Sequence, residues 1–165
     1  VEQEKTKDFK GTIIVGDSRT ANIEDRLHHF GIDKVQFVIY HPPYWDIIKF
    51  SDNEKDLSNC NSLEEFNQSF GEVIDNTSKY LEKNRYCACV IGDKYANSEI
   101  VPLGFYCMNL FLSRGFKLKA ILVKNFEDTK GKSNQKAIWR YRALASDFYL
   151  FKHEYIFVFK KVKEK

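Results

Sequence analysis

The chain has 165 residues, of which 43% are hydrophobic, 15% aromatic and 30% charged, with only three prolines. This composition predicts one compact domain and excludes a linker or a disordered tail. The formal net charge of +3 is too small to indicate a nucleic-acid-binding protein by itself. No apolar run reaches the roughly 18 residues that a membrane span requires, and the charged start VEQEKTKDFKG differs from a signal peptide.

The four cysteines lack the spacing of a metal site. They include no CxxC pair, and three of them stand inside apolar stretches, which argues against both a zinc site and a disulfide framework. Reduced, buried thiols are typical of a cytoplasmic protein, which is therefore the expected location. The cysteines are Cys60, Cys87, Cys89 and Cys107.

Five short apolar runs predict strands. Most of them are continuously apolar, which is typical of strands that are covered on both faces, as in a parallel sheet between layers of helices. The runs are Thr12–Val15, Val35–Tyr40, Cys87–Ile91, Leu118–Val123 and Tyr155–Phe159.

Three helices are expected between these strands. Ser62 and Glu65 form a capping-box pattern, and apolar residues then recur at helical spacing as far as Leu81. A second helix is predicted from about Ile100 to Ser113, with Gly115 placed for a left-handed cap, and a weaker one from Ala21 toward Phe30. Alternating strands and helices indicate an α/β sheet with crossover connections, in a single domain that spans residues 1–165.

The most informative motif is His41-Pro42-Pro43-Tyr44, which directly follows the Val35–Tyr40 run. Two prolines end the strand and fix the backbone, so that carbonyl oxygens are presented in a rigid turn. Such oxygens can accept hydrogen bonds from an amino group, and the following aromatic ring can stack on a planar base. The carboxyl end of a strand is also where open α/β sheets bind their ligands.

This motif resembles the (Asp/Asn/Ser)-Pro-Pro-(Tyr/Phe) sequence of the DNA amino-methyltransferases, which use S-adenosylmethionine to methylate N6 of adenine or N4 of cytosine. Upstream, Ile14–Arg19 resembles the strand and Gly-Asp turn of those enzymes. Segments around Gly92, Pro102 and Gly115, together with His153–Lys160, are similar to their later strands and helices. The resemblance implies a Rossmann-like class I methyltransferase sheet, mostly parallel with an antiparallel last strand, and DNA as the partner.

Carried over to this chain, the resemblance implies a role for each motif residue. Tyr44 would stack on the extruded base, while the Pro42 carbonyl and the His41 position would hold its exocyclic amine, with Pro43 completing the catalytic turn. His41 replaces the usual Asp, Asn or Ser, which leaves the choice between adenine and cytosine open. Asp17, Ser18 and His41 would bind the cofactor, although Gly16-Asp17 also reads as a turn and Asp17-Ser18 as a helix N-cap.

One part of the resembled enzymes has no counterpart here. The family places a glycine-rich turn against the methionine end of the cofactor, yet no two of the eight glycines are separated by one residue. We therefore expect an incomplete sheet that represents the target-base half of the catalytic domain. Because the chain starts at Val1 rather than at a methionine, it is expected to be the C-terminal portion of a larger enzyme, completed by an N-terminal half or a second subunit.

A basic segment, KGKSNQKAIWRYR, precedes the last predicted strand and contains no acidic residue. Basic side chains interleaved with aromatic ones suit a loop that contacts phosphates beside an unstacked base, although a solvated loop has the same composition. Two other functions remain open: an RNA amino-methyltransferase, and a non-catalytic subunit or truncated remnant that binds nucleic acid or a partner. The candidate DNA-binding residues are Lys130, Lys132, Lys136, Arg140 and Arg142.

Overall fold

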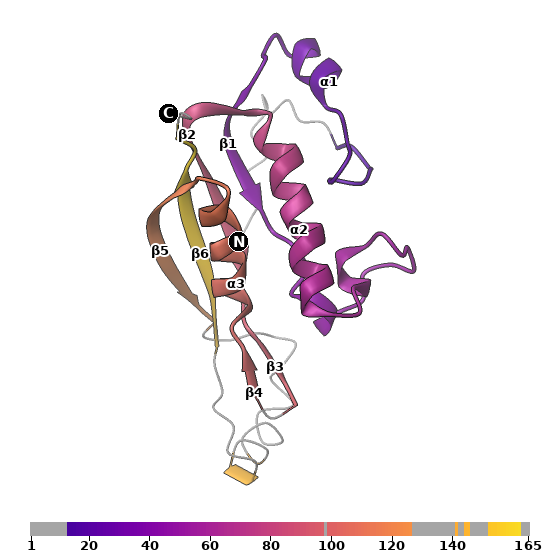
Figure 1. The fold of residues 1–165 in the computed structure, drawn as a ribbon, viewed down its shortest axis with the longest axis vertical. Coiled ribbons are helices and arrows are strands. Elements are labelled where there is room, and N and C mark those ends of the chain that lie inside the picture. Colours follow the sequence, from indigo (N-terminus) through magenta and orange to yellow (C-terminus); the bar gives the residue numbers. More distant parts are fainter. Residues whose placement is uncertain (1–12, 98, 127–140, 142–143, 146–151, 163–165) are drawn as a thin grey trace, which may run out of the picture.

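The computed structural model describes residues 13–97, 99–126, 141, 144–145 and 152–162. Its main sheet has the strand order β1-β2-β6-β5 (Figure 1). β1 and β2 are parallel, whereas β6, the last strand in the chain, is antiparallel to both β2 and β5. The predicted α/β class and the antiparallel last strand are confirmed. The bounds are β1 Val35–Tyr40, β2 Leu81–Ile91, β5 Lys117–Asn125 and β6 His153–Lys160.

The three predicted helices are present among the described residues. The capping box at the start of α2 is confirmed, because the Ser62 hydroxyl accepts a hydrogen bond from the Glu65 backbone N–H at 3.1 Å. The Glu65 carboxylate accepts the backbone N–H of Asn61. At the end of α3, Gly115 has φ +81°, which is the predicted left-handed cap. The helices are α1 Glu24–His29, α2 Leu63–Ser78 and α3 Leu103–Ser113, with short 3₁₀ turns at Trp45–Ile47 and Leu57–Asn59.

Both longer helices pack on the same face of the sheet. Tyr40 at the end of β1 makes edge-to-face contacts with Phe70 of α2 and with Phe111 of α3. On the opposite face, Phe37, Ile39 and Leu122 are 49%, 65% and 49% exposed. The prediction that strands are covered on both faces is therefore wrong for the described part of the chain, since the β1–α2–β2 and β2–α3–β5 connections cross the same face (Figure 1).

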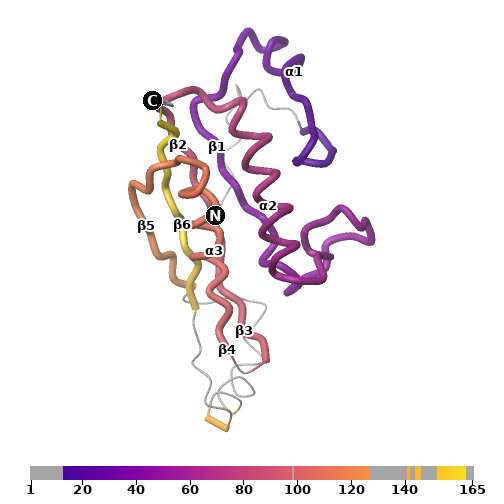
Figure 2. The backbone as a smooth tube through the Cα atoms, viewed as in Figure 1, coloured from indigo at the N-terminus to yellow at the C-terminus, as the bar shows by residue number. Residues whose placement is uncertain are grey.

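The first apolar run and the start of α3 differ from the predicted elements. Ile13–Val15, the described part of the first apolar run, forms no strand, and the side chains of Ile13 and Val15 are almost fully exposed. Ile100 is not helical, because it pairs with Tyr95 in a hairpin of β3 (Lys94–Ala96) and β4 (Glu99–Val101). Pro102 is instead the N-cap of α3. Figure 2 shows this hairpin projecting beyond the end of the sheet.

All four cysteines are buried and free, as the sequence predicts. Cys87, Cys89 and Cys107 lie in the hydrophobic core between the sheet and the helices. Burial raises the pKa of the Cys87 thiol to about 12, so this thiol stays protonated and unreactive at neutral pH. Among the described residues, no helix has the length and apolar character to cross a membrane.

Candidate active site

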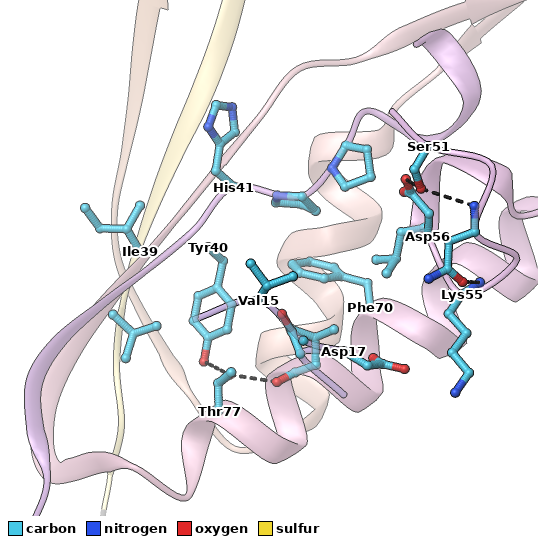
Figure 3. A pocket seen from close by; sticks show the side chains of 18 residues that line it. Val15, Asp17, Ile39, Tyr40, His41, Ser51, Lys55, Asp56, Phe70 and Thr77 are labelled. Carbon is cyan, nitrogen blue, oxygen red and sulfur yellow. Dashed lines mark hydrogen bonds between the residues drawn. The ribbon is translucent and has the colours of Figure 1, made fainter. Parts of the chain in front are cut away.

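A pocket of about 550 Å³ lies at the carboxyl end of β1 (Figure 3). Its walls come from four segments that are distant in the sequence: residues 15–18, the end of β1 with the first residues of the Pro-Pro turn, the loop from Ser51 to Leu57, and α2. The structure thus brings together most of the predicted catalytic and cofactor-binding residues. Those lining the pocket are Asp17, Ser18, His41, Pro42 and Pro43.

The end of β1 is fixed on α2 before the chain turns. The hydroxyl groups of Tyr40 and Thr77 are hydrogen-bonded at 2.8 Å, and the Thr77 hydroxyl donates to the carbonyl of Val73. Burial raises the pKa of Tyr40, so its hydroxyl stays protonated. Because Pro42 follows two residues after Tyr40 and is itself buried, the turn begins from a backbone that has little freedom to move.

Asp17 forms a turn that is bound to α2. Its carbonyl accepts the backbone N–H groups of Thr20 and Ala21, which confirms the turn interpretation. The N-cap interpretation is wrong, because α1 begins only at Glu24. Asn76 of α2 holds the turn by donating from its amide to the carbonyl of Ser18 at 3.1 Å.

The Asp17 carboxylate is ionised and oriented by Arg19. It accepts hydrogen bonds from the Arg19 backbone N–H, Nε and Nη2, at 2.9 to 3.0 Å. The Arg19 side chain is the main reason why the pKa of Asp17 lies below its usual range. Oδ2 accepts one of these bonds and Oδ1 two, so a carboxylate oxygen keeps a lone pair for a further donor. The pocket around this acceptor has apolar side chains, such as Val38 and Phe70, as well as polar ones, such as Asn53 and Lys55.

His41 and Tyr44 diverge at the turn. In Figure 3 the His41 imidazole points away from the Asp17 side chain. Tyr44 does not line the pocket; its ring lies on Gly92, just after β2, and its hydroxyl donates to Oε2 of Glu154 at 2.6 Å. Burial, followed by this hydrogen bond to a carboxylate, raises the pKa of Tyr44 above its ordinary value.

Glu154 and Lys124 belong to this rim of the sheet but were missed by sequence reasoning. Glu154 is buried at the start of β6, and its Oε1 accepts from Nζ of Lys124 on β5 at 2.8 Å. Burial acts to raise the pKa of Glu154, but the hydrogen bonds from Lys124 and Tyr44 outweigh it and hold that pKa below the usual range. The only sequence feature that could have pointed to Glu154 was its place as an acidic residue next to the predicted apolar strand Tyr155–Phe159.

The residues after the turn are also held in place. Trp45 has φ +52°, an uncommon conformation for a bulky residue, and its indole N–H donates to the carbonyl of Cys60 at 2.8 Å. The Lys94 ammonium lies 4.0 Å from the centre of a Trp45 ring and is also paired with Asp46. These contacts join the Pro-Pro turn to the β3–β4 hairpin.

The predicted DNA-binding residues Lys130, Lys132, Lys136, Arg140 and Arg142 all lie outside the described residues. Within that basic segment the structure describes Tyr141, whose side chain is largely exposed. In the described part of the chain, no three His, Cys, Asp or Glu side chains lie close enough together to hold a metal ion.

This arrangement of sheet, Pro-Pro turn and pocket is that of an α/β methyltransferase. Residues 35–165, which make up most of the chain, match the DNA methylase family. The protein therefore belongs to that family. The family resemblance inferred from the motif is thereby confirmed. No protein with a curated functional description matches the chain.

Solved structures show the same fold. TTHA0409 of Thermus thermophilus, described as a DNA modification methylase, has 19% sequence identity and a TM-score of 0.57 over 92% of this chain and 54% of its own. A second TTHA0409 structure is a complex with S-adenosyl-L-methionine, with a TM-score of 0.56, 19% identity and coverages of 92% and 55%. The cytosine-N4-specific PvuII DNA methyltransferase has 12% identity and a TM-score of 0.51 over 80% of this chain and 45% of its own. The chain thus spans about half the length of these structures.

Proposed function

We propose that this chain forms the target-base half of a DNA methyltransferase that transfers a methyl group from S-adenosylmethionine to the exocyclic amine of adenine or cytosine. The observation that carries the proposal is the position of the His41–Tyr44 turn, at the carboxyl end of β1 and beside a pocket that contains the ionised Asp17. The DNA methylase family match supports DNA rather than RNA as the substrate.

Asp17, Ser18 and His41 are the proposed cofactor-binding residues. The Asp17 carboxylate, oriented by Arg19, would accept a hydrogen bond from the adenine amino group, with apolar residues such as Val38 beside the rings. The cofactor supplies an electrophilic methyl group on a sulfonium. We expect a part of the enzyme beyond residues 1–165 to contribute the glycine turn for its methionine end.

The target base would be held by the turn itself. We propose that Tyr44 stacks on the extruded base, while the Pro42 carbonyl and the His41 imidazole accept hydrogen bonds from its amine. These bonds keep the nitrogen lone pair directed at the methyl group, so that positioning contributes much of the rate. The basic segment Lys130–Arg142 would neutralise phosphates beside the opened base pair.

The test is methyl transfer by the complete protein that contains this chain. Unmethylated genomic DNA and total RNA are incubated with radiolabelled S-adenosylmethionine, and the nucleosides are then identified by mass spectrometry. Methylated adenine or cytosine from DNA is expected. Tyr44→Ala should abolish most of this activity, since base stacking on an aromatic ring contributes about 1–3 kcal/mol, whereas Tyr106→Ala, a partly exposed tyrosine on α3, should leave it nearly unchanged.

Two outcomes would contradict the proposal. Label found only in RNA would indicate an RNA methyltransferase. A complete protein that binds DNA and S-adenosylmethionine without transferring the methyl group would indicate a non-catalytic subunit.

A further inference from the structure

The ring of Tyr44 is held at two separate points. A Cβ atom added to Gly92 would lie 2.7 Å from Cε2 of Tyr44, so the ring rests directly on the Gly92 backbone, where only a glycine leaves room. At the far end of the ring, the hydroxyl donates to Oε2 of Glu154 at 2.6 Å. The Gly92 contact restrains the Cδ2–Cε2 side of the ring and the Glu154 bond restrains its tip, so together they limit the movement of the ring.

The carboxylate of Glu154 is itself fixed. It is buried, with a side chain only 8% exposed, and each oxygen has one partner: Oε2 the Tyr44 hydroxyl and Oε1 the Lys124 ammonium. A hydroxyl-to-carboxylate bond of this length is of the strong, charge-assisted kind. Because burying a carboxylate is unfavourable unless it is paired, the Lys124 contact is what allows Glu154 to serve as an ionised anchor.

These contacts come from four separate parts of the chain. Tyr44 follows β1, Gly92 follows β2, Glu154 starts β6, and Lys124 lies one residue before the end of β5. All four strands of the main sheet therefore contribute to the orientation of one aromatic ring. A tyrosine that only packed the end of a strand could satisfy its hydroxyl with water at this half-exposed rim.

We infer that Glu154 is a positioning residue for methyl transfer: through the Tyr44 hydroxyl it fixes the position of the ring on which the target base stacks. The inference rests on the proposed function, because it assumes that the Tyr44 ring receives the base. The position of a stacked base follows the plane of the ring beneath it, and small displacements of a reacting atom reduce rates strongly. Glu154 acts through Tyr44 and does not itself contact the reacting atoms.

The test compares Glu154→Met, which removes the acceptor but keeps a side chain of similar length, with Glu154→Gln, which retains an acceptor oxygen. In the complete protein, Glu154→Met should lower kcat for DNA methylation about tenfold, an effect expected of misplaced reactants, and leave KM for S-adenosylmethionine unchanged. Glu154→Gln should restore most of the activity. Glu99→Gln, the same chemical change at an exposed position of β4, is the matched control and should have no effect.

A double-variant cycle with Tyr44→Phe separates positioning from general destabilisation. If Glu154 acts through the Tyr44 hydroxyl, then Glu154→Met should lower kcat no further once that hydroxyl has been removed. The inference would be overturned if Glu154→Met lowered kcat by the same factor in the wild type and in Tyr44→Phe, and if these losses followed the fall in melting temperature. The proposed function would remain intact in that case.

A second readout does not depend on catalysis. Tyrosine residues are replaced by 3-fluorotyrosine, and the Tyr44 signal is assigned by its loss in Tyr44→Phe. A restrained ring should give two slowly exchanging fluorine signals, and Glu154→Met should merge or shift them, whereas Glu99→Gln should not. An unchanged Tyr44 signal in Glu154→Met would overturn the inference, whether or not the protein methylates DNA.

Discussion

The ammonium group of Lys94 lies 4.0 Å from the centre of a ring of Trp45, although the two residues come from opposite sides of the 16-residue helix α2 in the sequence. Lys94 begins β3, and Trp45 directly follows the Pro-Pro turn. The Lys94 side chain is only 13% exposed, so this cation–π contact is partly shielded from water. It links the proposed base-binding turn to the β3–β4 hairpin.

Replacing Lys94 with methionine should therefore destabilise the protein. Methionine keeps the apolar stem but removes the charge, and we expect a loss of about 1–2 kcal/mol, the range for a largely desolvated cation–π pair. Chemical unfolding of the complete protein measures the change. Lys117→Met, at an exposed position at the start of β5, should cost less than half as much. Equal effects of the two substitutions would mean that the Trp45 contact adds nothing.

Gly92→Ala should disturb the Tyr44 ring. The new methyl group would lie 2.7 Å from Cε2 of Tyr44, so the ring must move, at a cost of about 1–3 kcal/mol for an overpacked contact. The melting temperature should fall, and it should fall less when Tyr44→Ala is also present. Gly16→Ala is the control, since a Cβ there meets no atom within 4 Å. A Gly92→Ala protein as stable as Gly16→Ala would contradict the close approach.

The fold could be predicted from the sequence where the signal is local. The capping box at Ser62 and Glu65 and the left-handed cap at Gly115 depend on residues a few positions apart, and both are present. The first half of β2 was not predicted, because it is polar and contains Asn84 at φ +64°, which interrupts any simple alternation. The hairpin was missed because its strands are only three residues long.

The site was predictable only in part, because only some of its contacts are made between residues that are close in the sequence. Pro42 and Tyr44 follow a strand directly, so their place at its carboxyl end followed from the sequence. Glu154 lies 110 residues from Tyr44, and its contact depends on β6 being antiparallel to β2, which no short motif encodes. The structure therefore adds the partner of the Tyr44 hydroxyl, whereas sequence reasoning had considered only the face of its ring.

The stabilising effect of Glu154 should depend on pH. Its pKa in the folded protein lies below the ordinary value of about 4.3, because the bonds from Lys124 and Tyr44 favour the ionised form despite burial. The stabilisation is therefore complete above that ordinary value and is lost as the pH falls through the folded pKa. The difference in melting temperature between the wild type and Glu154→Gln should be large at pH 7 and should decrease as the pH falls below the ordinary pKa of a glutamate.

Glu99→Gln corrects this comparison for the removal of one carboxylate from the protein. A difference between the wild type and Glu154→Gln that stays constant from pH 7 to acidic pH would show that the ion pair with Lys124 does not stabilise the fold.

The basic segment should account for part of the salt dependence of DNA binding. Replacing Lys136, Arg140 and Arg142 with alanine in the complete protein should weaken binding to all DNA sequences. Each lost phosphate contact should reduce the slope of log affinity against log salt by about 0.9, because fewer counterions are released. Affinity is measured by fluorescence anisotropy at several salt concentrations, with Lys117→Ala and Lys119→Ala as controls on β5. An unchanged slope would identify the segment as solvated surface.

Asp17→Asn should weaken binding of S-adenosylmethionine by the complete protein. The proposed bond from the adenine amino group to a carboxylate is charge-assisted, and such bonds contribute about 1.5–3 kcal/mol, so the dissociation constant should rise roughly 10- to 100-fold. Arg19→Met is the matched variant, because it breaks the same local ion pair but leaves the Asp17 carboxylate in place. If Asp17 only secures its own turn, the two variants should lose thermal stability and cofactor affinity to the same extent. Calorimetric titration of both proteins, with their melting temperatures, separates these cases, and a cofactor affinity equally reduced in Arg19→Met would remove Asp17 from the proposed binding site.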